Sequence, residues 1–161
     1  MKKTLLLIAI AASLITNAQV NTVSLQASGL TCSMCSNAIN KALKALDFVQ
    51  DVDADMKSYT FQVSFKPNSI IDFDMLRKSV EKAGFTVCAF VATIHFDKRE
   101  VKINQPVTIQ HQTFLFANGA TTLLDGNMLI KFLDKGFVSQ KEYKQHAFLA
   151  PPPHSYHVAL D

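Results

Sequence analysis

Apolar and polar residues follow two different periods in the first third of the chain. In residues 23–28 they alternate at every second position, which is typical of a half-buried strand. In residues 36–46 the apolar positions recur at helical spacing, with Lys41 and Lys44 on the opposite side. The pattern therefore predicts a strand and an amphipathic helix, joined by a loop over residues 29–35.

The same reasoning extends over the next segment of the chain. Strands are predicted at 48–54 and 59–65, a second helix at 72–83 and a fourth strand at 85–91. The order strand–helix–strand–strand–helix–strand predicts an α+β, ferredoxin-like fold, in which two helices cover one face of a four-stranded antiparallel sheet. The fourth strand is apolar on nearly every residue, whereas a sheet with one wet face alternates. We therefore expect residues 95–148 to pack against this first domain.

The second half of the chain predicts a small, strand-rich module over residues 95–149. Its expected elements are strands at 101–109 and 112–117, a hairpin across the Asp125-Gly126 turn, and a short helix from Ser139. The three consecutive prolines that follow stiffen an extended chain. Residues 150–161 are therefore predicted to form a tail.

The first eighteen residues have the pattern of a secretory signal peptide. Lys2 and Lys3 precede an apolar run at 5–15, and small residues lead to a cleavage site after Ala18. The run is shorter than the roughly 20 apolar residues of a membrane-spanning helix. The sequence therefore predicts a domain boundary between residues 18 and 19. It also predicts a periplasmic or secreted protein, with no stable membrane insertion after cleavage.

The net charge and its distribution limit the kinds of molecule that the protein is expected to bind. Loss of the two signal lysines lowers the formal net charge from +3 to +1, and the remaining charges are scattered. Nucleic-acid binding needs a concentrated basic face, so a nucleic-acid partner is not expected. A hydrophobic content of 48% with 18% charged residues is that of an ordinary globular protein.

Two of the three cysteines carry the candidate chemistry. Cys32 and Cys35 form a C-x-x-C between the first strand and the first helix, where the helix dipole favours thiolates by lowering the thiol pKa. Soft thiolates prefer Cu(I), whereas zinc normally takes three or four protein ligands, and no second C-x-x-C is present. The alternative to metal binding by Cys32 and Cys35 is a disulfide between them. Met34 is interpreted as a loop residue facing solvent rather than as a third sulfur ligand. Cys88 is interpreted as a small buried hydrophobe in the fourth strand rather than as a regulatory partner of the motif cysteines.

The loop resembles a known motif. Gly29-Leu30-Thr31-Cys32-Ser33-Met34-Cys35 is similar to the G-M-T-C-x-x-C of heavy-metal-associated domains. These domains occur in copper chaperones, in periplasmic mercury-binding proteins and at the amino termini of copper-pumping ATPases. The resemblance covers about residues 20–94, and the Ala83-Gly84-Phe85 segment before the fourth strand also matches. It places the domain at residues 19–94 and leaves residues 95–161 unassigned.

The resemblance implies specific roles for four residues. Cys32 and Cys35 would be the metal ligands, most simply for Cu(I), with Hg(II) or another soft ion as the alternative. Leu30 stands where the family usually has Met and would pack beneath the loop. Phe85 matches a position whose side chain often lies near the metal loop.

Three functions are compatible with these residues. The first is an exported protein without enzymatic activity that binds a soft metal ion and exchanges it with a metal-exporting or metal-accepting protein. The second is a thiol–disulfide oxidoreductase with Cys32 as nucleophile and Cys35 as resolving thiol, although the order of elements is not that of thioredoxin. The third is a non-catalytic interaction module.

The five histidines are further candidate metal ligands. His154 and His157 form a His-x-x-His that could bind Cu(II) or zinc weakly, but a mobile polar tail is the expected context. The remaining three show no ligand spacing and are expected to be surface or hydrogen-bonded residues: His95, His111 and His146.

Overall fold

The fold is known from a computed structural model that describes residues 19–31, 33–103, 105–117, 122–146 and 151–161. Its elements are, in chain order, β1 (Gln19–Ser28), α1 (Ser33–Lys44), β2 (Val49–Asp55), β3 (Thr60–Phe65), α2 (Phe73–Lys82), β4 (Thr86–Val101), β5 (Pro106–Ile109), β6 (Gln112–Phe116), β7 (Thr122–Phe132), α3 (Gln140–His146) and β8 (Ser155–Leu160). In this part of the chain all strands join one sheet, in the order β2-β3-β1-β4-β7-β8-β6-β5.

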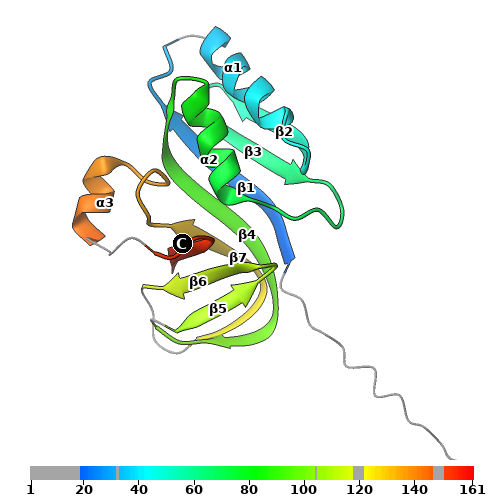
Figure 1. The fold of residues 1–161 in the computed structure, drawn as a ribbon, viewed down its shortest axis with the longest axis vertical. Coiled ribbons are helices and arrows are strands. Elements are labelled where there is room, and N and C mark those ends of the chain that lie inside the picture. The colour runs from blue at the N-terminus through cyan, green and yellow to red at the C-terminus, as the bar shows by residue number, and fades with distance from the viewer. Residues whose placement is uncertain (1–18, 32, 104, 118–121, 147–150) are drawn as a thin grey trace, which may run out of the picture.

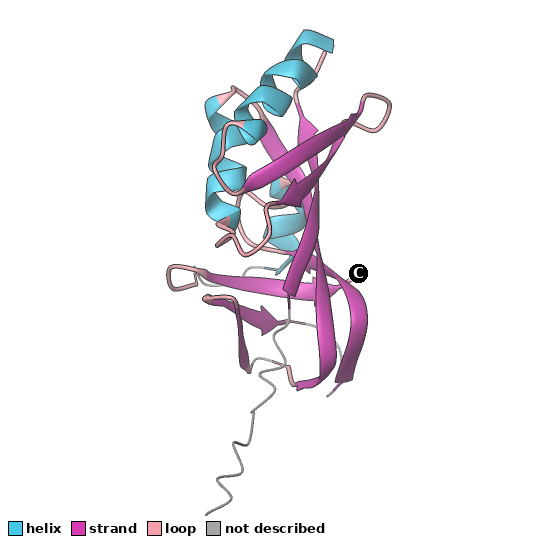
Figure 2. Ribbon diagram, turned by 90° about the vertical axis from the view of Figure 1, so that its right-hand side faces the viewer, coloured by secondary structure: helices cyan, strands magenta, loops and turns pink. Residues whose placement is uncertain are grey.

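The first half has the predicted α+β, ferredoxin-like architecture. Strands β2, β3, β1 and β4 pair antiparallel with their neighbours, and α1 and α2 cover one face of them (Figures 1 and 2). Val23 and Leu25 of β1 and Ile39 of α1 are completely buried in the core. The predicted fold class is therefore confirmed for this half.

Local signals explain where α2 begins and ends. The Asp72 carboxylate accepts a hydrogen bond from the backbone N–H of Met75 at 2.9 Å, which caps the first turn. Gly84 follows the helix with a φ of +92°, a conformation that glycine adopts without strain. Phe73, Leu76 and Val80 form the fully buried stripe between these ends. No helix in the described ranges combines the length and apolarity needed to cross a membrane.

Strand β4 is longer than the sequence pattern predicts and belongs to both halves (Figure 1). Residues Thr86 to His95 pair with β1, and Val91 to Val101 pair antiparallel with β7. The boundary predicted between residues 94 and 95 falls within this strand. Whether 19–94 and 95–149 fold as separate units stays a prediction.

The predicted hairpin across Asp125-Gly126 is wrong. Both residues lie inside β7, where Gly126 pairs with Phe96 and Leu124 pairs with Arg99. Asp97 and Lys98 of β4 therefore lie opposite Asp125 alone, which is a β-bulge. Gly126 has a φ of +77°, so its conformational freedom accommodates this irregularity instead of reversing the chain.

The predicted tail is also wrong for most of residues 150–161. Ser155–Leu160 form β8, which pairs antiparallel with β7 and parallel with β6 in the middle of the second half of the sheet. Tyr156 is 2% exposed and Val158 is fully buried. Burial of these apolar side chains holds the segment in the sheet, although three prolines precede it.

An aromatic cluster joins the two halves through the helix side of the sheet. Its members are Phe73, Phe90, Phe114, Phe132, Phe137 and Tyr156. Phe132 of β7 lies at its centre, with ring centroids 4.9 Å from Phe73 of α2 and 4.8 Å from Phe90 of β4. The second half therefore packs against the first, as the apolar fourth strand predicts.

Gly136 is held against α2 closely enough to test this packing. Its φ is +88°, and a Cβ built on it would lie 2.9 Å from Cδ of Arg77. Arg77 is itself fixed, since its guanidinium bonds Asp74 and Glu81 and lies 5.4 Å from the centre of the Phe137 ring. Gly136→Ala is expected to lower the free energy of unfolding by about 2–4 kcal/mol, measured by urea denaturation.

Gly84→Ala is the matched control for this prediction. Gly84 has a similar φ of +92°, but nothing lies within 4 Å of its built Cβ. The control therefore carries the backbone strain without the steric overlap and should be the milder of the two. Equal destabilisation by both substitutions would contradict the packing of Gly136 on Arg77.

Candidate metal-binding loop

A short loop of residues 29–31 follows β1 and leads toward the C-x-x-C motif. Gly29 opens it with a φ of +89°, and a Cβ on Gly29 would lie 3.9 Å from Cδ1 of Phe85. The positive φ favours glycine here. The structure therefore places the Phe85 ring beside the loop, as the resemblance implies.

Leu30 anchors the loop from below. Its side chain is only 9% exposed and belongs to the main hydrophobic core, whereas Thr31 is exposed. Leu30 thus packs beneath the loop, in agreement with the expectation. Burial of a leucine side chain contributes about 1.5–3 kcal/mol, so this contact fixes the backbone that leads into α1.

Helix α1 begins at Ser33, three residues before the predicted start at Ser36. Met34 and Cys35 therefore lie in its first turn and not in the loop. Met34 is 80% exposed, as predicted, and Cys35 is half-buried and packed against the core. The buried stripe of the helix starts only at Ser36, so the periodicity of apolar residues could not reveal the earlier start.

The first turn of α1 suits a thiolate. It contains no acidic residue, so no carboxylate offsets the positive end of the helix dipole there. Cys35 lies in this turn, where the dipole stabilises negative charge on sulfur. Cys32 lies outside the described residues, and the assignment of Cys32 and Cys35 as a ligand pair stays a prediction.

Cys88 is in a different environment. It lies at a β-bulge between β1 and β4, with its sulfur 3.4 Å from the carbonyl oxygen of Gln26. Burial raises the pKa of its thiol. The side chain is half-buried rather than fully buried. A neutral thiol is a poor metal ligand, so Cys88 is a weak candidate for the site.

Ser36 follows Cys35 and was not singled out by the sequence. Its side chain is 2% exposed, and its hydroxyl oxygen has no hydrogen-bond partner in the described structure. The available signal was its spacing, because Ser36 shares the buried stripe of α1 with Ile39 and Leu43. A polar residue in such a stripe is expected to be buried.

Ser36→Ala is expected to stabilise the protein. The change removes a buried hydroxyl without a partner and should raise the free energy of unfolding by about 1 kcal/mol, measured by urea denaturation. Ser79→Ala, a half-buried site in α2, controls for the higher helix propensity of alanine. A loss of stability at position 36 would show that its hydroxyl makes a favourable contact after all.

The histidines of the predicted tail do not form a shared site. Nδ1 of His157 lies 2.8 Å from Oδ1 of the buried Asp134, whose other oxygen accepts the backbone N–H of His157 at 2.7 Å. His154 lies outside β8, at a φ of +57°. His95 contacts Asn127 at 2.9 Å, as expected for a hydrogen-bonded surface residue. Within the described ranges, no three or more His, Cys, Asp and Glu residues are grouped to hold a metal.

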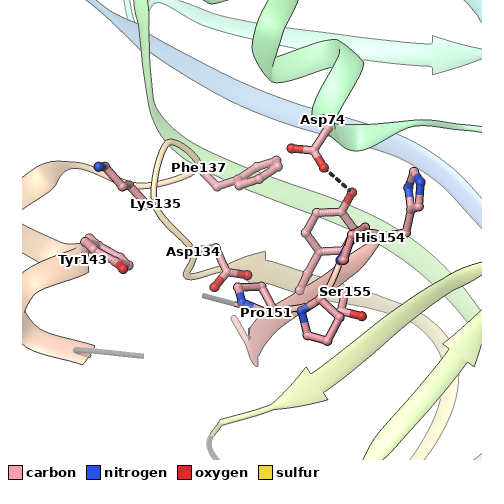
Figure 3. A pocket seen from close by; sticks show the side chains of 11 residues that line it. Asp74, Asp134, Lys135, Phe137, Tyr143, Pro151, His154 and Ser155 are labelled. Carbon is pink, nitrogen blue, oxygen red and sulfur yellow. Dashed lines mark hydrogen bonds between the residues drawn. The ribbon is translucent and has the colours of Figure 1, made fainter. Parts of the chain in front are cut away.

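A cavity of about 260 Å³ lies beside His154, between α2 and the segment that precedes β8 (Figure 3). Asp74, Phe137 and Tyr156 line it, and the Tyr156 hydroxyl donates to Oδ2 of Asp74 at 3.2 Å. Burial raises the pKa of the Tyr156 phenol, and the charges of Asp74 and Asp72 add to the shift. The phenol is therefore protonated at neutral pH and ties β8 to α2.

Comparison with known proteins finds matches for the first half of the chain. Residues 24–86 match the family model of the heavy-metal-associated domain. The probable copper-transporting ATPase HMA5 of Arabidopsis thaliana is 38% identical over 60 residues, which are 37% of this chain and 6% of that ATPase. The chain thus spans only a small part of this curated relative.

Solved structures align with the same portion of the chain. The yeast copper transporter domain Ccc2a is 32% identical and covers 40% of this chain and 88% of its own, with a TM-score of 0.37. Oxidized MerP from Ralstonia metallidurans CH34 is 28% identical and covers 43% of this chain and 97% of its own, with a TM-score of 0.38. The family model confirms the resemblance for residues 24–86 and does not extend to residues 87–161.

Proposed function

From the heavy-metal-associated domain at residues 24–86, we propose that this protein binds a soft metal ion, Cu(I), through Cys32 and Cys35 and transfers it to a partner protein. The observation that carries the proposal is the place of Cys35 in the first turn of α1, directly after the loop that Leu30 anchors. The positive end of a helix dipole favours the thiolate form of a cysteine there, and thiolates prefer Cu(I).

Two thiolates would bind the ion tightly and still leave it open to exchange. A Cu(I) ion held by two sulfurs accepts a third from an incoming protein, so it can pass along without being released to solvent. The partner would be a metal-exporting or metal-accepting protein, and the likeness to a copper-transporting ATPase supports this class. Hg(II) is a second soft ion that the same pair would take. No catalytic step is part of the proposal.

The proposed location is outside the cytoplasm. Cleavage after Ala18 would leave Gln19, the first residue of β1, at the amino terminus of the mature chain. Mass spectrometry of the protein recovered from its host should then give a chain of residues 19–161. A retained segment 1–18 would contradict export by this route. In an oxidising compartment a Cys32–Cys35 disulfide would block loading, so the redox state limits the function.

Anaerobic loading tests the function directly. Reduced protein of residues 19–161 should take up one Cu(I) per chain in competition with a colorimetric Cu(I) chelator, and X-ray absorption should show sulfur ligands. Protein oxidised to join Cys32 and Cys35 is the control and should not load. Zn(II) should bind far more weakly, because two thiolates leave half of its shell to water. Failure to take up Cu(I), together with catalysis of disulfide reduction in insulin, would instead support the oxidoreductase alternative.

A further inference from the structure

Two histidines from distant parts of the sequence line one cavity at the seam between the two halves. The cavity has a volume of about 280 Å³, and His111 and His154 line it together with the segment 70–72 that leads into α2. The turn between β5 and β6, which carries His111, lies below the beginning of α2 in Figure 1. This cavity is separate from the candidate metal-binding loop, and the inference below does not depend on the proposed function.

The backbone segments that carry the two histidines are held side by side. The N–H of Thr113, two residues after His111, donates to the carbonyl oxygen of His154 at 2.9 Å. The parallel pairing of Thr113 with Ser155 continues this contact into β6 and β8. Both histidine side chains are exposed, and exposed side chains change rotamer readily. The two rings can therefore converge by side-chain rotation alone, without a change of the backbone.

Neither of these imidazoles is held by another side chain in the described ranges. No hydrogen bond or ion pair engages the ring of His111 or His154 there. By contrast, the ring of His157 bonds Asp134, and that of His95 bonds a neighbouring amide. Figure 3 shows the ring of His154 pointing away from Asp134. The structure thus divides the His-x-x-His of the sequence and brings His154 together with His111 instead.

The charge and the size of the cavity favour a small cation. The carboxylate of Asp72 belongs to the same lining, where its negative charge attracts a cation. Among the described residues of the lining, none is a lysine or an arginine. The volume of about 280 Å³ lies below the range of about 300–1,000 Å³ that is typical of small-molecule sites. A hydrated ion therefore matches the cavity better than an organic ligand does.

We propose that His111 and His154 bind a divalent transition-metal ion, Cu(II), at this cavity. Imidazole is a common ligand of Cu(II), Ni(II) and Zn(II), and a given nitrogen site has its highest affinity for Cu(II) in this series. Cu(II) takes a tetragonal shell of nitrogen and oxygen ligands, so water completes the shell that two imidazoles begin. In the described ranges no group of three or more His, Cys, Asp and Glu residues is arranged to hold a metal, so Asp72 acts through its charge. Two protein ligands make the ion readily exchangeable.

Titration of ¹⁵N-labelled protein of residues 19–161 with Cu(II) tests the proposal. Cys32 and Cys35 are replaced with serine in this protein, so that their thiols neither bind the ion nor reduce it. Substoichiometric Cu(II) should first broaden the NMR signals of residues 70–72, 110–113 and 154–155, and electron paramagnetic resonance should show nitrogen ligands. Broadening centred on another part of the chain, or no saturable uptake, would overturn the proposal.

Substitution of each histidine provides an independent test by isothermal titration calorimetry. His111→Asn and His154→Asn should each weaken Cu(II) binding by about tenfold or more, because even a residue that only supports a ligand contributes about 10–100-fold. Asparagine tolerates the positive φ of +70° and +57° at these positions, so the backbone should be retained. His95→Asn removes a hydrogen-bonded histidine of β4 and should leave the affinity unchanged. Full affinity in either His111→Asn or His154→Asn would contradict a site made by both histidines.

Discussion

Replacing Cys32 or Cys35 with serine is expected to abolish tight Cu(I) binding, with a loss of affinity of more than about a hundredfold for each single change. Loss of a partner that merely supports a ligand costs about 10–100-fold, and a direct ligand should exceed that range. Serine keeps the size and the helix position of Cys35 but offers a hard oxygen that remains protonated at neutral pH. An anaerobic competition titration of each variant measures the effect.

Cys88→Ser is the matched control for these variants. The Cys88 thiol lies against the Gln26 carbonyl in β1, and burial raises its pKa, so it should contribute no thiolate to the loop. Its Cu(I) affinity should equal that of the unmodified protein. If Cys35→Ser binds Cu(I) as tightly as Cys88→Ser does, the metal-transfer function is wrong for this chain.

Removal of β8 is expected to have the largest effect on stability. A chain that ends at residue 154 lacks the strand that joins β7 to β6, together with the buried Tyr156 and Val158. Loss of one buried aromatic side chain alone costs about 3–5 kcal/mol. We therefore expect the free energy of unfolding of the second half to fall by roughly 5 kcal/mol or more, measured by urea denaturation and near-ultraviolet circular dichroism.

Tyr156→Phe separates the strand from its hydroxyl. This control keeps the ring in the aromatic cluster and loses only the hydrogen bond to Asp74, which retains Arg77 as a partner. It should cost about 1 kcal/mol. Unchanged stability after truncation would show that β8 is dispensable. Cu(I) binding by the truncated chain would show in addition whether the first half folds alone.

The sequence predicted the first half well because elements such as β1 and α2 have one buried and one exposed face. In β1 the burial alternates residue by residue, and in α2 the buried Phe73, Leu76 and Val80 follow helical spacing. Both periods can be read without knowledge of partners. The start of α1 was not predicted correctly, because Met34 in its first turn is exposed and lies outside any buried stripe.

The sequence-based prediction of the second half was wrong at two segments, where the local residue pattern favours a structure other than the strand that the sheet imposes. Asp125-Gly126 has the composition of a tight turn, but long pairing of β7 with β4 keeps it extended as a bulge. The three prolines favour an exposed chain, but Tyr156 and Val158 gain more by burial between β6 and β7. Pairing with strands that are distant in the sequence determines the structure of both segments, and such pairing cannot be read from a local residue pattern.

Only some of the residues around the candidate metal-binding loop could be placed from the sequence. The motif placed Cys35 at a helix start, and Leu30 and Phe85 lie where the resemblance implies. The cavity lined by residues 70–72, the β5–β6 turn and His154 could not be predicted, because these segments meet only through the order of the strands. In particular, the parallel pairing of β6 with β8 sets His154 beside the β5–β6 turn.

Strand β4 runs without interruption from the metal-binding loop into the second half of the sheet. It is 16 residues long, and it carries a β-bulge opposite Asp125. Its first residue pairs with Ser28, next to the metal-binding loop, and its far part carries the second half of the sheet. A protein that touched both the metal-binding loop and the second half of the sheet would therefore meet them in one fixed relative orientation. Its second contact would form at a high effective concentration, without the conformational entropy that a flexible tether loses.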